Sequence, residues 1–300
     1  MERTGGLRVT HTSEVTPDQI DHLGHMNVRH YGANARAGTR SLLADLGVRS
    51  VRSVDLHDLY TRHHHEQLVG ARLEVRSGVL GVDADSIRVY HELVNAETED
   101  LGATFVFRVR SDVPLDHVDT VELPAHGAPR SIDLDAETTL PDLSTVRELG
   151  LELRAERQVD EEDTAGGESV STHLLPNLVW GGDPPDGTEH ELVHRGPDGQ
   201  PVGWATMETR LGVHRIPALG TTIQSFAATT AIAEKVTKSS MWAYDVGTGE
   251  VLVTFEVVNI LFDIGARRAL VIPDDLRAEH EQRHHPELAP QRRDGHGRAG

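Results

Sequence analysis

Asp21, His25 and Asn27 lie close together in the stretch DQIDHLGHMNVRHYGANARAGTR, and all three side chains can take part in chemistry at a carbonyl group. A carboxylate can act as a general base on a water molecule or attack the carbonyl itself. An imidazole can donate or shuttle a proton near neutral pH, and an amide can hold the water or the substrate. The simpler interpretation is that the Asp and the Asn only form a turn and cap a helix.

A helix is predicted to begin directly after these residues. From Val28 onward the chain lacks proline, is rich in alanine and places its leucines at helical spacing. Asn27 occupies the N-cap position and Gly47 suits a helix end, so we predict a helix over about residues 28–46. Free N–H groups and the positive dipole end at its start would stabilise the negative charge that develops on an attacked carbonyl oxygen.

The segments around this helix are typical of β-strands. Residues 7–16 are rich in β-branched side chains, and four further runs follow the helix. These runs span residues 53–63, 69–82, 86–95 and 101–113, with the polar turn NAETED between the last two. The order predicts an α+β unit in which one helix packs against one antiparallel sheet.

Residues 200–275 repeat landmarks of the first part at an offset of 150, which predicts an internal duplication. The matched pairs are Gly70 and Gly220, Thr98 and Thr248, Thr104 and Thr254, Phe105 and Phe255, and His64 and His214. The second copy has glycine and proline breakers in WGGDPPDGTEHELVHRGPDG, where its helix should fall. At the same offset Ser171 and Leu175 replace Asp21 and His25, while Asn177 matches Asn27, so we predict a degenerate second copy.

These patterns divide the chain into four parts. Residues 1–115 form the first domain, and residues 116–170 form a linker with a short helix near 142–156 and a mobile acidic loop over 157–169. Residues 171–276 form the second domain. The polar tail over residues 277–300 has no periodicity, and we expect it to be disordered.

The composition argues against several classes of protein. The 300 residues carry a net charge of −19, which is unsuited to binding nucleic acid or an anionic membrane surface. The absence of cysteine removes thiol nucleophiles, disulfides and cysteine-based metal sites. Because the sequence shows neither a signal peptide nor a membrane span, we expect a cytoplasmic protein.

The stretch DHLGHMNVRHY resembles the signature of hot-dog-fold thioesterases, the 4-hydroxybenzoyl-CoA thioesterase group and its acyl-ACP thioesterase relatives. Their pattern is an Asp, then Gly-His-Val-Asn-Asn, then a Tyr, at the start of the central helix. Met26 replaces the Val and Val28 replaces the second Asn. The later strand runs are also similar to the family, so that the resemblance covers roughly residues 7–113. The matching residues are Asp21, Gly24, His25, Asn27 and Tyr31.

The resemblance implies a double hot-dog chain, an antiparallel sheet wrapped around a central helix, that hydrolyses acyl-CoA or acyl-ACP thioesters. It implies one active site, in the first half, no cofactor and no metal, and a chain that can form homo-oligomers. Tyr31 is interpreted as a packing residue that lines the pocket. The expected catalytic residues are Asp21, His25 and Asn27, and the expected substrate-binding residues are Gly24, Tyr31, His64 and Glu66.

Three alternatives stay open. A hot-dog hydratase or dehydratase resembles Asp-x-Asn-Pro-x-His, but here Leu23 stands at the Asn position and His25 follows Asp21 by four residues. A non-catalytic acyl-thioester-binding protein would have no need of the acid. The sequence HELVH at 190–194 fits a zinc-hydrolase pattern, yet it lies between two turn signals with too little room for the helix that the pattern requires.

Overall fold

The computed structural model describes residues 3–4, 6–21, 24–48, 56–110, 118–164, 167–170, 174–180, 194–196 and 199–292. The strands are β1 Arg3–Thr4, β2 Leu7–Glu14, β3 Leu56–His63, β4 Arg72–Val82, β5 Ser86–Asn95, β6 Leu101–Arg110, β7 Glu152–Gln158, β8 His194–Arg195, β9 Pro201–Val213, β10 Thr222–Ile232, β11 Val236–Asp245, β12 Val251–Asp263 and β13 Arg268–Ala269. The helices are α1 Val28–Asp45, α2 Leu143–Glu148, α3 Glu161–Thr164, α4 Leu175–Trp180 and α5 Asp274–Gln282, with short 3₁₀ turns η1 Pro17–Gln19 and η3 Pro286–Leu288.

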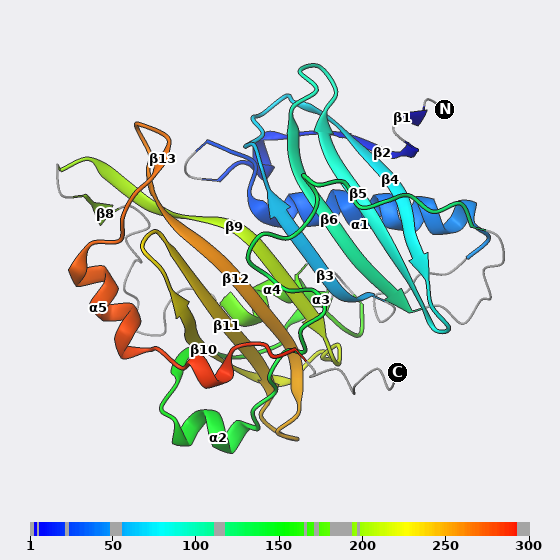
Figure 1. Cartoon of the computed structure of the whole chain (residues 1–300). Helices are drawn as coiled ribbons and strands as arrows, with labels where there is room; N and C mark the ends of the chain where they lie inside the picture. The colour runs from blue at the N-terminus through cyan, green and yellow to red at the C-terminus, as the bar shows by residue number, and fades with distance from the viewer. Residues whose placement is uncertain are drawn as a thin grey trace, which may run out of the picture.

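The strands form one antiparallel sheet in the order β1-β2-β4-β5-β6-β3-β9-β12-β11-β10-β7, with β13 beside β12 and β8 beside β9 (Figure 1). Helices are few and lie against this sheet. A large antiparallel sheet with few helices confirms the predicted fold class at this level.

The long helix α1 matches the predicted central helix to within one residue. It begins where predicted because the Asn27 side-chain Oδ1 accepts the Arg29 N–H at 3.1 Å, and it ends at Asp45, two residues before Gly47, which has a φ of 86°. α1 lies across β2, β4 and β5 (Figure 1). Gly38 allows this close approach, because a Cβ there would come within 2.6 Å of the Val75 side chain.

The two halves of the sheet repeat the same strand register at an offset of 150. Leu73 pairs with Asn95 in β4–β5, and Ile223 pairs with Asp245 in β10–β11. Both hairpins have a register shift at equivalent places, after Val79 and after Thr229. The sequence landmarks that suggested a repeat therefore lie at equivalent positions of two sets of four strands, β3–β6 and β9–β12.

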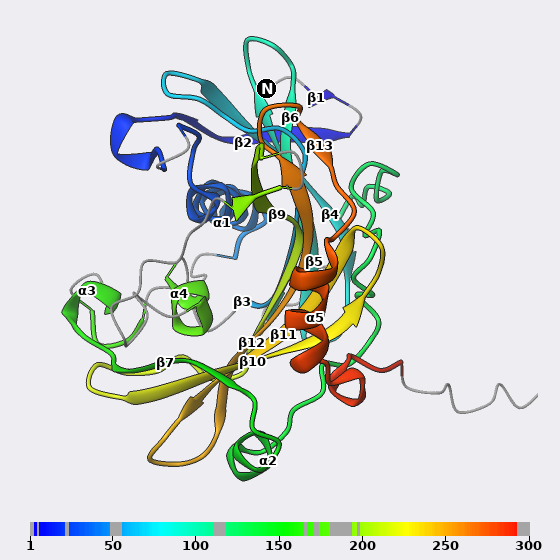
Figure 2. The same cartoon turned by 90° about the vertical axis from the view of Figure 1, so that its left-hand side faces the viewer.

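β3 and β9 join the two halves edge to edge. Leu59 pairs with Leu211 and Tyr60 with Arg210, whose guanidinium donates to both carboxylate oxygens of Asp58 at 3.0 and 2.9 Å. α1 and α4 lie on one side of the resulting sheet and α5 on the other (Figure 2). Side chains of α1 and α4 belong to the same buried apolar core, so the two halves share one interior.

The face of the sheet opposite α1, here called the outer face, is crossed by residues 118–136, here called the strap. The Val121 N–H donates to the Val79 carbonyl at 2.8 Å. Glu208 of β9 is buried and accepts the Tyr60 hydroxyl at 3.1 Å. The same carboxylate accepts three consecutive N–H groups of the strap at 3.2 Å, those of Arg130, Ser131 and Ile132.

The predicted linker over residues 116–170 contains the short helix expected near 142–156, as α2, but it is wrong in part because it also contains a strand of the sheet, β7, and the helix α3. β7 pairs with β10 along its length, although only Ala155 among its apolar residues is buried. A polar edge strand of this kind has little hydrophobic pattern to reveal it. The acidic tract includes α3, whose Asp163 forms an ion pair of 2.5 Å with Arg157 of β7. The second unit therefore begins at β7.

The prediction of a disordered tail over residues 277–300 is wrong for the part that the structure describes. α5 extends to Gln282, and the ring of His280 lies edge-on to Trp204 with 5.1 Å between centroids. Leu288 in η3 is buried against the outer face of the second half. A few apolar and aromatic contacts therefore order a segment whose overall composition is polar. Residues 293–300 lie outside the described residues.

Candidate active site

The loop between β2 and α1 is fastened by backbone hydrogen bonds to the loop that follows β3. The Gly70 N–H donates to the Val15 carbonyl at 2.8 Å, and the Met26 N–H donates to the Gln67 carbonyl at 2.8 Å. Met26 is also buried in the core. These contacts hold the polar motif at the start of α1.

Asp21 shapes the turn that leads into α1. Its N–H donates to the His25 carbonyl at 2.8 Å, its carbonyl accepts the Gly24 N–H at 3.0 Å, and its Oδ1 accepts the His25 N–H at 3.2 Å. Gly24 has a φ of 86°, a conformation that favours glycine, and a Cβ there would meet no described residue within 4 Å. Asp21 and Gly24 therefore build a compact turn with open space beside it.

Asn27 caps α1 and leaves one donor available at its start. The Asn27 N–H donates to the Gln19 carbonyl at 2.8 Å, and its Oδ1 accepts the Arg29 N–H at 3.1 Å. Of the backbone N–H groups from Gly24 to His30, that of Val28 donates to no acceptor within the described part of the chain. This N–H lies at the positive end of the helix dipole, where an anionic oxygen is stabilised.

His25 connects the first half to the second half. Its ring Nε2 lies 3.2 Å from the Glu66 carboxylate, and the same carboxylate forms an ion pair with Arg267 from the turn between β12 and β13. Arg267 has a φ of 51°, and its guanidinium lies 6.0 Å from the centroid of the Phe262 ring. Arg267 was not predicted from the sequence, because nothing local links two residues about two hundred positions apart.

Tyr31 fastens the loop after β3 from within the core. It is buried, its hydroxyl accepts the Gln67 N–H at 3.0 Å, and the hydroxyl lies 3.4 Å from the His65 carbonyl. Burial raises the pKa of Tyr31 to about 12. Its ring lies edge-on to His63, with 5.3 Å between centroids. Tyr31 is therefore a neutral phenol that packs and positions the loop.

His64 lies on the outer face, so the structure does not bring it together with the predicted residues of the motif. Its Nε2 lies 3.3 Å from the Thr104 hydroxyl, and burial lowers its pKa to about 4. His214 and Thr254 form the same 3.3 Å contact in the second half, which marks a repeated structural pair. His63, whose ring faces Tyr31, is the histidine of this run that lies near the motif. The sequence alone does not show which of the adjacent histidines faces α1.

The second half contains an equivalent loop without the three polar side chains. The Gly220 N–H donates to the Val159 carbonyl as Gly70 does to Val15, and the Val170 N–H donates to the Pro217 carbonyl as Met26 does to Gln67. This loop is therefore offset by 144 and not by 150, so the expected match of Asn177 with Asn27 is wrong. The residues at the positions of Asp21, His25 and Asn27 are Ala165, Ser169 and Ser171.

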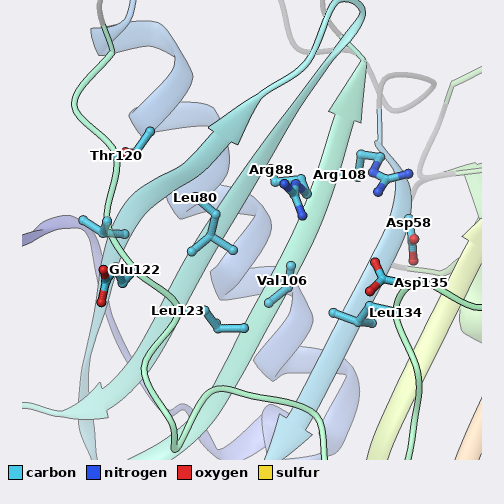
Figure 3. Close-up of a pocket in the computed structure, with 11 residues that line it drawn as sticks. Asp58, Leu80, Arg88, Val106, Arg108, Thr120, Glu122, Leu123, Leu134 and Asp135 are labelled. Atoms are coloured by element: carbon cyan, nitrogen blue, oxygen red, sulfur yellow. The ribbon is translucent and has the colours of Figure 1, made fainter. Parts of the chain in front are cut away.

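A cavity of about 580 Å³ lies on the outer face, beneath the strap (Figure 3). Arg88 and Arg108 face each other across β5 and β6 in it, and Leu80 and Leu134 contribute apolar walls. The carboxylate of Asp58 in this cavity is already paired with Arg210. Since the cavity lies on the opposite side of the sheet from α1, it is separate from the candidate active site.

No helix in the described part of the chain is long and apolar enough to cross a membrane. Among the described residues no three His, Asp or Glu side chains are grouped so that they could hold a metal ion. The HELVH stretch lies outside the described residues except at its last position.

The first half of the chain matches a known protein family. Residues 15–113 match the model of the thioesterase-like superfamily. A betainyl-CoA thioesterase of Pseudomonas aeruginosa is 32% identical over 90 residues, which cover 28% of this chain and 57% of that protein. The chain thus spans little more than half the length of this curated relative.

Solved structures of two thioesterases share the fold of this chain over more than four fifths of its length. An acyl-ACP thioesterase from Bacteroides thetaiotaomicron aligns with a TM-score of 0.57 at 11% identity, over 83% of this chain and 96% of its own. The 12:0-ACP thioesterase from Umbellularia californica aligns with a TM-score of 0.55 at 10% identity, over 84% of this chain and 93% of its own. Residues 15–113 therefore resemble the thioesterase-like superfamily, and the chain shares the hot-dog fold of these thioesterases, in agreement with the resemblance of the motif at the start of α1.

Proposed function

We propose that the chain is a double hot-dog protein that hydrolyses acyl thioesters of coenzyme A or acyl carrier protein at one site, at the start of α1. The observation that carries the proposal is the Val28 N–H, which has no acceptor among the described residues and lies at the helix start beside Asn27 and the Asp21–His25 turn. The repeated strand register supports the double fold. The loop that lacks the three polar side chains supports a second half that acts as scaffold and pocket wall.

In the proposed reaction the thioester carbonyl oxygen accepts a hydrogen bond from the Val28 N–H, which stabilises the charge that develops there. Asp21 either removes a proton from a water that attacks the carbonyl carbon or attacks that carbon itself to form an anhydride, which water then opens. In both routes the C–S bond breaks and the sulfur leaves with a proton as the thiol. One water is consumed and a carboxylic acid is released.

His25 and Asn27 orient the reacting groups in this proposal. Because Glu66 holds the His25 ring through Nε2, Nδ1 is the ring nitrogen that can exchange a proton with the leaving thiol. Because the Asn27 Oδ1 accepts the Arg29 N–H, its Nδ2 is the group that can hold the water or the thioester. The space beside Gly24 leaves room for the substrate.

Thiol release from wild-type protein tests the proposal, with betainyl-CoA and 12:0 thioesters of coenzyme A and of acyl carrier protein as the first substrates. The named relatives motivate this choice. Release of thiol together with the free acid is the expected result. Addition of water to an unsaturated acyl-CoA, with the thioester intact, would instead identify a hydratase.

A non-catalytic thioester-binding protein is the second candidate, and the geometry of Asp21 favours it over the hydratase. The Asp21 Oδ1 is engaged by the His25 N–H, so the acid has a structural use without any chemistry. Acyl-CoA bound at equilibrium with no release of thiol from any substrate in the panel would support this alternative and contradict hydrolysis.

A further inference from the structure

Helix α1 carries a buried cation that the proposed reaction does not use. Arg36 is only 6% exposed, and its Nη2 finds no hydrogen-bond acceptor in the described part of the chain. Burial, and to a lesser degree the positive charge of Arg40, lowers the pKa of Arg36 to about 9. No carboxylate among the described residues forms an ion pair with this guanidinium.

Arg62, which is buried, and Arg210, which is partly buried, show how such a group is normally satisfied. Arg210 donates to both oxygens of Asp58, and Arg62 donates to the Ala128 carbonyl at 2.9 Å. A guanidinium removed from water without a partner is costly, and native proteins seldom keep one without a functional reason or a bound group. Among the described residues Arg36 therefore has no counterpart to the acceptors that Arg62 and Arg210 have.

The position of Arg36 on the helix shows which part of the molecule it faces. Asn34 points to β2, where its Oδ1 accepts the Ser13 hydroxyl at 2.6 Å. Arg36 lies two residues later, about 200° around the helix. β2 lies near the free end of the sheet in the first half, whereas β3 pairs with β9 of the second half. Arg36 is thus on the flank of α1 toward β3 and the second half.

The guanidinium also folds back toward the start of α1. A Cβ at Gly32 would lie 3.3 Å from the Arg36 Nη1, so the glycine makes room for it. Gly32 follows Asn27 by five residues, which is roughly 7–8 Å along the helix axis. An acyl chain that runs from the Val28 N–H along this flank would therefore bring its far end to Arg36.

We propose that Arg36 binds a carboxylate at the far end of the acyl group, so that the preferred substrate is a thioester of a dicarboxylic acid. This inference rests on the proposed thioester hydrolysis. A guanidinium and a carboxylate form two parallel charge-assisted hydrogen bonds, and this pairing would supply the partner that Arg36 lacks. A plain hydrocarbon acyl group would leave the cation unpaired. The phosphates of the carrier are a less suitable partner, because they lie on the sulfur side of the thioester carbonyl, whereas the acyl group runs from that carbonyl toward Arg36.

The test compares glutaryl-, adipoyl- and suberoyl-CoA with hydrocarbon acyl-CoAs of matched length, for wild type and Arg36→Met. Arg40→Met is the control, because Arg40 is exposed one turn later on the same helix. Wild type should favour the carboxylate-bearing series in kcat/KM. Arg36→Met should lower kcat/KM for that series by about 10- to 100-fold, the scale for a lost charged hydrogen bond, and spare the hydrocarbon series. Arg40→Met should change neither series.

Binding of free adipate by calorimetry separates this inference from the proposed function. If no thioester is hydrolysed but adipate binds wild type and not Arg36→Met, the hydrolysis proposal fails and the anion site stands. An unchanged ratio between the two series in Arg36→Met would overturn the inference, as would an equal loss for both series. If Arg36→Met does not fold, Arg36→Gln takes its place, because it keeps a hydrogen-bond donor without the charge. Adipate bound equally by Arg36→Gln and wild type would also overturn it.

Discussion

Replacing Asp21 with asparagine separates the two roles that this side chain can play. The Asp21 Oδ1 accepts the His25 N–H at 3.2 Å and so holds the turn before α1. Asparagine has the same shape, keeps an oxygen for this bond and serves equally well in turns. It lacks the charge that a general base or a nucleophile needs. A variant that folds like wild type but hydrolyses slowly would assign chemistry to the carboxylate.

The expected fall in kcat is about 10²–10⁴-fold, the usual scale for the loss of a positioned acid or base. The free energy of unfolding should change by no more than about 0.5 kcal/mol, because the His25 N–H keeps its acceptor. For a chain of this length that corresponds to a change in Tm of roughly 1–2 °C. Asp21→Ala removes the hydrogen-bond acceptor as well, so its free energy of unfolding should be lower by roughly a further 1 kcal/mol.

Thiol release with a chromogenic reagent and thermal melting should be measured side by side for wild type, Asp21→Asn and Asp21→Ala. Asp18→Asn is the matched control, because Asp18 is an exposed carboxylate on η1 just before the motif. It should leave both kcat and Tm unchanged. A folded Asp21→Asn variant that hydrolyses as fast as wild type would refute a catalytic role for Asp21 and leave it as a turn former.

Three further predictions concern stability and the second half. Burial lowers the pKa of His91 to about 3, whereas in the unfolded chain the pKa is 6.5. Between these values the unfolded chain binds a proton that the folded state does not. The contribution of His91 to the free energy of unfolding is therefore fully present above pH 6.5 and is lost as the pH falls toward 3. The unfolding free energy of His91→Gln should depend less steeply on pH over this range, and its slope should be smaller than that of wild type by about 1.4 kcal/mol per pH unit. Denaturant titrations at several pH values would measure both slopes. Arg210→Met leaves Asp58 unpaired at the junction of the halves and should cost about 3–5 kcal/mol in denaturant unfolding; a loss below 1 kcal/mol would show that solvent compensates. Ser169→Ala and Asn177→Ala should leave kcat unchanged, and a large loss in either folded variant would show that the second half contributes chemistry.

The parts of the fold that the sequence predicts well are those encoded by local signals. α1 has an N-cap at Asn27, a run of alanine and leucine, and Gly47 at its end, so each boundary is marked by its own residue. The repeated meander was visible because its turns need particular residues at fixed positions, such as Gly70 and Gly220, both with positive φ. Such requirements act over a few residues and do not depend on the rest of the chain.

The parts that the sequence predicts poorly depend on partners far away in the chain. β7 is a polar edge strand that is defined by its pairing with β10. The histidine run at 63–65 could not be assigned to a face, because that depends on the phase of β3 in the sheet. Arg267 reaches Glu66 only because β3 and β9 join the halves. The predicted match of Asn177 with Asn27 failed because the number of residues between the loop and the next strands differs between the halves. The hydrogen bonds of the two loops reveal this difference, whereas residue identities do not.

The central claim is that the Val28 N–H stabilises the thioester oxyanion, and Val28→Pro tests it most directly. Proline at position 28 removes this N–H and no other hydrogen-bond donor. It suits the first position of a helix and requires an extended residue before it. Asn27, with φ −58° and ψ 137°, already has that conformation, so α1 should keep its stability. Against Val28→Ala, which keeps the N–H, we predict a fall in kcat of about 10²–10³-fold with an unchanged or higher Tm. Hydrolysis by Val28→Pro at the rate of Val28→Ala would contradict the account.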